Sequence, residues 1–268
     1  MCKSLARLFV VFVFVFGLIL SAPFVSVVSA SEEIPTGSSV LLRNTTSTTC
    51  QVPVSILIQW SDYDIFVNII EEIITSKYIP ITYDTFYEMC EAGVDTSHTV
   101  ILTYDDIGPL GIYPVLKEMM TYANSKGIVG VVGIVKGDFE TKDWGFLRSL
   151  SIDGWQIANH TKNHPDKGLP SLSEKRIRDE IEYVQQKIYL EIGYFPKTLI
   201  LPGGVYLKDE RINRIVKEMG INFIVGIPTE INPIVVRGNS PFYVGRVTTL
   251  SDKYFTPWRY ALRIFDTQ

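Results

Sequence analysis

The fold class of this chain is decided by one stretch, Val100-Ile101-Leu102-Thr103-Tyr104-Asp105-Asp106-Ile107-Gly108-Pro109. Its apolar start is typical of a strand buried on both faces, and the Gly-Pro pair is a turn signal. Two adjacent carboxylates, Asp105 and Asp106, stand at the end of the strand. Because parallel sheets bind ligands beyond the carboxyl ends of their strands, this position favours a functional site. The alternative is an ordinary turn, in which Asp-Asp before glycine is also common.

Predicted strands and helices alternate along the rest of the chain. The strands are expected at residues 54–58, 100–106, 128–135, 155–158, 198–201, 223–226 and 242–247. The helices are expected at residues 64–77, 82–91, 113–126, 143–150, 171–190 and 209–219, and a final short amphipathic segment at residues 258–265. This alternation predicts an α/β protein built from parallel βα units. The charged residues of the 171–190 helix are interpreted as a solvated face.

A second stretch, Gly154-Trp155-Gln156-Ile157-Ala158-Asn159-His160-Thr161-Lys162-Asn163-His164, places two of the three histidines of the chain after a short apolar run. Residues four apart lie one helical turn apart, which points both imidazoles to the same side. Two imidazoles and one carboxylate can bind a divalent metal and leave one position open for water. A histidine pair on a solvated surface is the alternative, but an acid pair and a histidine pair that each follow a strand favour the metal site.

These two stretches together resemble a known family. Thr103-Tyr104-Asp105-Asp106 followed by His160-Thr161-Lys162-Asn163-His164 is similar to the first two motifs of the polysaccharide deacetylases, the NodB-homology or carbohydrate esterase 4 family. The likeness runs through most of residues 52–247. It implies a distorted (β/α) barrel and a metal-dependent hydrolase that removes acetyl groups from a polysaccharide.

The resemblance also implies roles for single residues. Asp106, His160 and His164 would bind the metal, with zinc the first expectation and cobalt, nickel or manganese also compatible with this ligand set. Asp105 would be the base, and the backbone amide of Tyr104 would stabilise the oxyanion.

The third family motif, Arg-x-Pro-Tyr/Phe-Gly, is present only in part. Ile200 stands in place of the arginine and Gly203 in place of the aromatic residue, which leaves a more open wall. Arg246 is the expected substitute for the orienting arginine, and Arg237 is the weaker candidate. The residues expected to contact substrate are Thr103, Pro202, Gly203, Gly204 and Tyr206.

The general acid of the family is not found. Family members use a histidine from a late Leu-His or an early Tyr-His motif, but here no histidine follows His164, and Gln59-Trp60 stands where Tyr-His would. His98 precedes the Asp-Asp strand and is expected far from the metal. Asp62 or Asp64 could act as a substitute acid. The alternative function is therefore a catalytically impaired relative that binds glycan and retains the metal site.

Residues 1–30 are predicted to be a secretory signal peptide. A basic start with Lys3 and Arg7, a long apolar run and the small residues Val28-Ser29-Ala30 fit that pattern, with an uncleaved N-terminal anchor as the alternative. Residues 31–51 are expected to be a flexible lead-in, and residues 52–268 one catalytic domain. The formal net charge of −4 gives no support to a nucleic-acid partner, and a membrane is expected only if the leader is uncleaved.

The chain is therefore expected to act outside the cytoplasm, on an N-acetylated or O-acetylated polysaccharide or oligosaccharide. Outside the leader it has two cysteines, Cys50 and Cys90. In an exported protein they permit one disulfide, but the sequence does not show that they meet.

Overall fold

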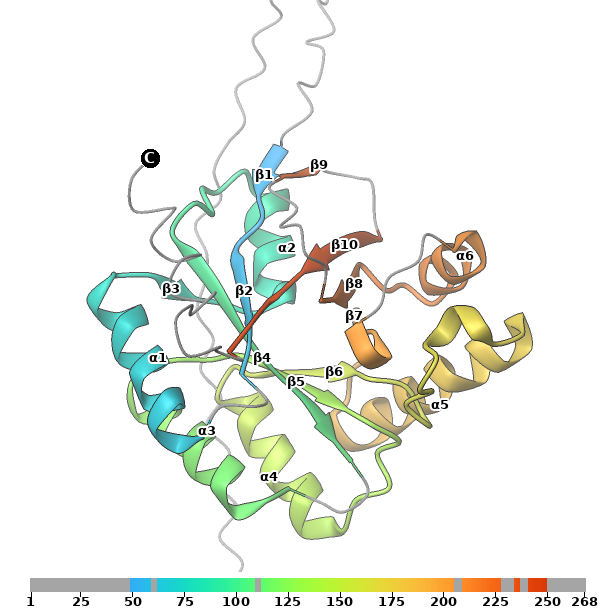
Figure 1. Cartoon of the computed structure of the whole chain (residues 1–268), viewed down its shortest axis with the longest axis horizontal. Helices are drawn as coiled ribbons and strands as arrows, with labels where there is room; N and C mark the ends of the chain where they lie inside the picture. Colours follow the sequence, from blue (N-terminus) through green and yellow to red (C-terminus); the bar gives the residue numbers. More distant parts are fainter. Residues whose placement is uncertain are drawn as a thin grey trace, which may run out of the picture. The chain divides into compact units, whose positions relative to one another are not determined.

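The structure is a computed structural model that describes residues 49–58, 62–108, 112–204, 209–227, 234–236 and 241–249. Its main sheet is parallel and nearly closed into a barrel, with helices along its outside (Figure 1). The strands of this sheet are β2 (Val54–Leu57), β3 (Ile79–Pro80), β4 (Thr99–Ile107), β5 (Val131–Ile134), β6 (Gln156–Asn159), β7 (Thr198–Ile200), β8 (Phe223–Gly226), β10 (Phe242–Gly245) and β11 (Val247–Thr248). The predicted distorted (β/α) barrel is confirmed.

The sheet closes through one short run of chain. The strand order is β10-β8-β7-β6-β5-β4-β2-β11, and β3 pairs with β4 outside this path. The two ends of the order, β10 and β11, are separated in the sequence only by Arg246. The run pairs first with β8 and then with β2, so it joins the two ends of the sheet. We call residues 242–248 the closing run.

The helices connect the strands as the alternation predicts. They are α1 (Tyr63–Thr75), α2 (Tyr83–Glu91), α3 (Pro114–Ser125), α4 (Thr141–Ile152), α5 (Glu174–Ile192) and α6 (Glu210–Glu218), with 3-10 turns η1 (Leu169–Ser171) and η2 (Pro202–Gly204). Two helix starts differ from the sequence prediction by more than one residue. Ser173, not Ser171, precedes α5, and α4 begins two residues before Asp143, whose carboxylate pairs with Lys117.

Side-chain alternation along β4 separates two of the three apolar clusters of the described residues. Successive strand residues point to opposite faces of a sheet. On β4, Val100 and Leu102 belong to the core beneath the outer helices, whereas Ile101 belongs to a second core that also contains Tyr83 and Phe86 of α2. Asp105 follows Ile101 by four residues, so the same alternation points Asp105 to the face of the sheet that carries this second core, which is the inside of the barrel.

A small two-stranded sheet lies outside the barrel. Its strands β1 (Thr49–Gln51) and β9 (Ile234–Val236) pair antiparallel. The flexible lead-in predicted to reach residue 51 therefore ends earlier than expected, since its last three residues form β1. Cys50 of this strand forms a disulfide with Cys90, which answers the question that the sequence left open. The amphipathic segment expected at residues 258–265 lies outside the described residues.

No helix in the part of the chain that the structure describes has the length and the apolar character needed to cross a membrane.

Candidate active site

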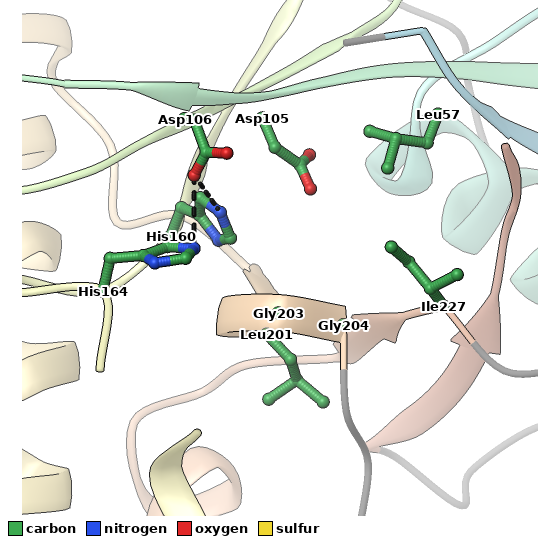
Figure 2. A pocket seen from close by; sticks show the side chains of 9 residues that line it. All are labelled: Leu57, Asp105, Asp106, His160, His164, Leu201, Gly203, Gly204 and Ile227. Carbon is green, nitrogen blue, oxygen red and sulfur yellow. Dashed lines mark hydrogen bonds and ion pairs between the residues drawn. The ribbon is translucent and has the colours of Figure 1, made fainter. Parts of the chain in front are cut away.

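The end of β4 directs both carboxylates toward one site. Asp105 points inward by strand alternation and is only 4% exposed. Strict alternation would send Asp106 to the opposite face, but the pairing of β4 with β5 shifts register between Tyr104 and Ile107. Asp106 has φ 58°, in the left-handed region that non-glycine residues seldom adopt. This irregularity turns Asp106 toward the histidines that follow β6 (Figure 2).

The two histidines meet Asp106 from a loop rather than from a helix. Thr161 and His164 have φ 67° and 46°, so the segment from His160 to His164, here called the histidine loop, is not a helical turn. The Nε2 atoms of His160 and His164 lie 3.0 Å and 3.2 Å from Oδ1 of Asp106. The helical-turn argument from the sequence was wrong about the backbone, although the two imidazoles do face the same carboxylate.

The donor set fits a divalent metal. One ligand atom from each of Asp106, His160 and His164 lies within 4.8 Å of the others. Nδ1 of His160 is 3.0 Å from the carbonyl oxygen of Ile200, so a proton on Nδ1 leaves the Nε2 lone pair available for a metal. Burial lowers the pKa of His160, but the hydrogen bond to Asp106 and the charges of Asp105 and Asp106 outweigh burial and raise it. The raised pKa thus reports the two carboxylates that lie beside His160.

Asp105 is held by Arg246 of the closing run. Nη1 and Nη2 of Arg246 donate to the two carboxylate oxygens of Asp105, at 2.7 Å and 2.8 Å. The guanidinium also donates to Thr103 Oγ1 and to the carbonyl oxygen of Gly226. The side chain of Arg246 is 0% exposed and that of Asp105 5%, which makes this a buried bidentate ion pair. Arg246 thus pairs with Asp105 from the junction of β10 and β11, whereas Ile200, which stands in place of the family arginine, belongs to β7.

A pocket opens beside these groups. Its volume is about 140 Å³, and it is lined by Leu57, Asp105, Asp106, His160, His164, Leu201, Gly203, Gly204 and Ile227. All of these residues lie at or just beyond the carboxyl ends of β2, β4, β6, β7 and β8, where a parallel sheet keeps its ligands. Figure 2 shows the histidines on the Asp106 side of the pocket and Leu57 and Ile227 on the Asp105 side.

The structure separates the residues predicted to contact substrate. Gly203 and Gly204 line the pocket. Thr103 does not line the pocket, because it is 0% exposed. Its hydroxyl donates to the carbonyl oxygen of Ile56 and accepts from Arg246, and these contacts take the place of the expected contact with substrate. Pro202 is buried and is absent from the pocket lining, and Tyr206 lies outside the described residues.

Neither candidate for a substitute general acid, Asp62 or Asp64, lines the pocket. Asp62 caps α1, where its carboxylate accepts a hydrogen bond from the amide of Ile65 at 2.8 Å, and Asp64 is exposed in the first turn. His98 precedes β4, at the opposite end of the strand from Asp105, as expected. Gln59 and Trp60, like Arg237, are outside the described residues.

Three apolar pocket residues were missed by the sequence analysis: Leu57, Leu201 and Ile227. Leu57 is one residue before the end of a predicted strand, Leu201 ends one and Ile227 directly follows one, so their positions could have been found by treating every strand end as part of the site. Nothing in their chemistry singles them out, because a leucine at a strand end is most often core.

Comparisons with known proteins agree with this geometry. Residues 92–224 match the family model for polysaccharide deacetylase. Peptidoglycan-N-acetylglucosamine deacetylase PgdA of Listeria monocytogenes is 24% identical over 129 residues, which cover 48% of this chain and 25% of that protein. Peptidoglycan-N-acetylmuramic acid deacetylase PdaA of Bacillus subtilis is 26% identical over 139 residues, which cover 52% of this chain and 48% of that protein. The matches thus span a quarter to a half of the length of these relatives.

Two solved structures share the fold. The Streptococcus pyogenes deacetylase PplD, solved with acetate, aligns with a TM-score of 0.60 at 14% identity and covers 81% of this chain and 98% of its own. IcaB from Ammonifex degensii aligns with a TM-score of 0.61 at 16% identity and covers 80% of this chain and 97% of its own. The barrel, the Asp-Asp strand, the histidine loop and the family match agree, and this chain carries a domain of the polysaccharide deacetylase family.

Proposed function

We propose that this protein is a metal-dependent hydrolase that removes acetyl groups from an extracellular polysaccharide. The observation that carries the proposal is the convergence of Asp106, His160 and His164 beside a separate carboxylate, Asp105, that a buried arginine holds in place. The PgdA and PdaA matches, both named as peptidoglycan deacetylases, support a cell-wall or related glycan as substrate.

In this proposal Asp106, His160 and His164 would bind the divalent ion, with zinc the first expectation for two imidazoles and a carboxylate. Such an ion supplies two things to hydrolysis, since it lowers the pKa of a water molecule toward about 7 and polarises an acetyl carbonyl.

The protein groups around the ion divide the remaining tasks. Asp105 accepts a proton from the attacking water, while its pairing with Arg246 fixes the direction of the carboxylate oxygens. The expected oxyanion role of the Tyr104 amide is left out of this proposal, because Tyr104 pairs with Val132 of β5 within the sheet and does not line the pocket. Gly203 and Gly204 form the wall along which the glycan lies.

The test is acetate release from N-acetylated chitooligosaccharide and from O-acetylated xylan. The protein is stripped of metal and reloaded with zinc, and it is compared with an Asp105→Asn variant. Asp95→Asn is the matched control, because Asp95 precedes β4 at the opposite end from the site and contacts only its neighbour Ser97 in the described hydrogen bonds.

Zinc-dependent release that persists in the control and falls at least a hundredfold in Asp105→Asn would support the proposal. Zinc binding without acetate release from either substrate would favour the alternative, a catalytically impaired protein that binds glycan. A protein that binds none of zinc, cobalt, nickel and manganese would contradict both functions.

A further inference from the structure

The histidine loop is fastened to α5 through its backbone. The amide of Lys162 donates to the carbonyl oxygen of Glu180 at 2.9 Å. At the start of the loop, the side chain of Asn159 accepts from the amide of Thr161 at 2.9 Å and donates to the carbonyl oxygen of Ile181 at 2.8 Å. The middle of α5 therefore serves as a support for the segment that carries both histidines.

The strongest of these attachments is a buried carboxylate. Glu180 is 6% exposed, although it stands on a helix whose charged residues the sequence suggested were all solvated. Its Oε2 accepts from the backbone amide of Asn163 and its Oε1 from Asn163 Nδ2, both at 2.7 Å. A buried carboxylate is costly unless its oxygens are hydrogen-bonded, so this pairing requires Asn163 to stay where it is.

Asn163 directly precedes His164. Of the two histidine ligands, His164 is the one with fewer contacts to hold its side chain in place. His164 is held at φ 46°, a backbone conformation that is unfavourable for a residue with a side chain. The side chain of His160 is 2% exposed and its ring also contacts the Ile200 carbonyl oxygen, whereas the side chain of His164 is 32% exposed. The contact between Glu180 and Asn163 fixes the backbone from which His164 reaches Asp106.

We propose that Glu180 is a positioning residue of the metal centre, which acts through Asn163 to keep His164 in its metal-binding place. The inference rests on the proposed function, because it presumes that Asp106, His160 and His164 bind a metal. Residues that support metal ligands from outside typically change metal affinity about 10- to 100-fold when they are replaced. Because Glu180 acts through one intervening residue, the lower end of that range, about tenfold, is expected.

The chain offers a matched control in the preceding residue. Asp179 is also acidic, is also on α5 and also contacts the histidine loop, through Lys162 Nζ at 3.1 Å. Its side chain is 60% exposed, and it touches the far end of a flexible lysine rather than the backbone. Replacing Asp179 should therefore leave the position of His164 unchanged.

The experiment measures the zinc dissociation constant of the full chain by competition with a chromophoric chelator. Glu180→Gln, which keeps the shape of the side chain but places an amide donor against Asn163, should weaken zinc binding about tenfold. Asp179→Asn should stay within about twofold of the unmodified protein. Asn163→Ala removes the Nδ2 hydrogen bond and keeps the backbone one, so it should weaken zinc binding in the same direction but less. The loss in the Glu180→Gln/Asn163→Ala double variant should be smaller than the sum of the two single losses, because both changes act on the same contact.

A second readout separates positioning from catalysis. At saturating zinc, kcat for acetate release should change less than twofold in Glu180→Gln, while the zinc concentration needed for half activity rises. Since Asn163 is exposed, Asn163→Ala carries the test if Glu180→Gln does not fold. Unchanged zinc affinity in Asn163→Ala or in a folded Glu180→Gln protein, or an equal loss in Asp179→Asn, would overturn the inference. An unmodified protein that binds none of zinc, cobalt, nickel and manganese would instead refute the proposed function.

Discussion

Replacing Arg246 by methionine should cost the domain about 3 kcal/mol of unfolding free energy. The change removes both hydrogen bonds to Asp105, together with those to Thr103 Oγ1 and the Gly226 carbonyl oxygen. Breaking a buried ion pair by removing one partner typically costs about 3–5 kcal/mol, because the other charge stays buried and uncompensated. The lower end applies here, since Asp105 borders the pocket and water can reach part of the carboxylate.

The assay is urea unfolding of four proteins: the unmodified chain, Arg246→Met, Asp105→Asn and the double variant. Because the double variant leaves no buried charge behind, it should be more stable than Arg246→Met, with a coupling energy of about 1–3 kcal/mol between the two sites. Arg246→Lys tests geometry separately, since an ammonium keeps the charge but loses the bidentate contact. A loss below about 1 kcal/mol in Arg246→Met, or a double variant no more stable than the single, would refute the reasoning.

Three further predictions concern stability. Burial raises the pKa of Asp84 from 3.8 to about 6, so the folded state binds this proton more tightly than the unfolded state does. The contribution of protonated Asp84 to the free energy of unfolding is therefore lost as pH rises through about 6. Asp84→Asn should raise the free energy of unfolding at pH 7.5 by up to about 3 kcal/mol but should not raise it at pH 4. Urea unfolding at both pH values measures this difference. Reducing the disulfide between Cys50 and Cys90, which are 40 residues apart, should cost about 4 kcal/mol by loop-closure entropy, and an unchanged melting temperature in reductant would contradict this. Gly204→Ala should lower the free energy of unfolding by about 1–3 kcal/mol more than Gly203→Ala, as measured by thermal unfolding. Both residues have positive φ, but only a Cβ at position 204 would meet a side chain, that of Ile227 at 2.5 Å.

The fold could be predicted because its signals are local. Each buried strand is a short apolar run, each helix has a helical repeat, and their alternation leaves few topologies. The predicted strand at residues 223–226 matches β8, and most other elements differ from prediction by a few residues at their ends. The prediction missed the break at Arg246, because a run of residues that pairs with two different neighbours looks like one strand in the sequence.

The site could be predicted only where chemistry and spacing coincide. Asp106, His160 and His164 are conspicuous residue types at strand ends, and the structure brings them together. The backbone that does so could not be predicted, since neither the register shift after Tyr104 nor the left-handed conformation of His164 has a glycine to mark it.

Glu180 had a signal that the sequence analysis passed over. It lies three residues after Ile177 and four before Val184, and all three side chains are buried. A carboxylate on the apolar stripe of an amphipathic helix has no solvent-facing position to occupy. That placement, rather than the presence of a charge, distinguishes Glu180 from its exposed neighbours on α5.

The closing run also has a consequence for the order in which the protein matures. A ribosome makes the chain from the amino terminus, so the proposed metal ligands exist about eighty residues before Arg246 is synthesised. Until that residue arrives, Asp105 has no guanidinium beside it and the edges of β2 and β8 are unpaired. Completion of the barrel and orientation of the proposed base are thus a single late event, and a chain that ends before Arg246 would lack both.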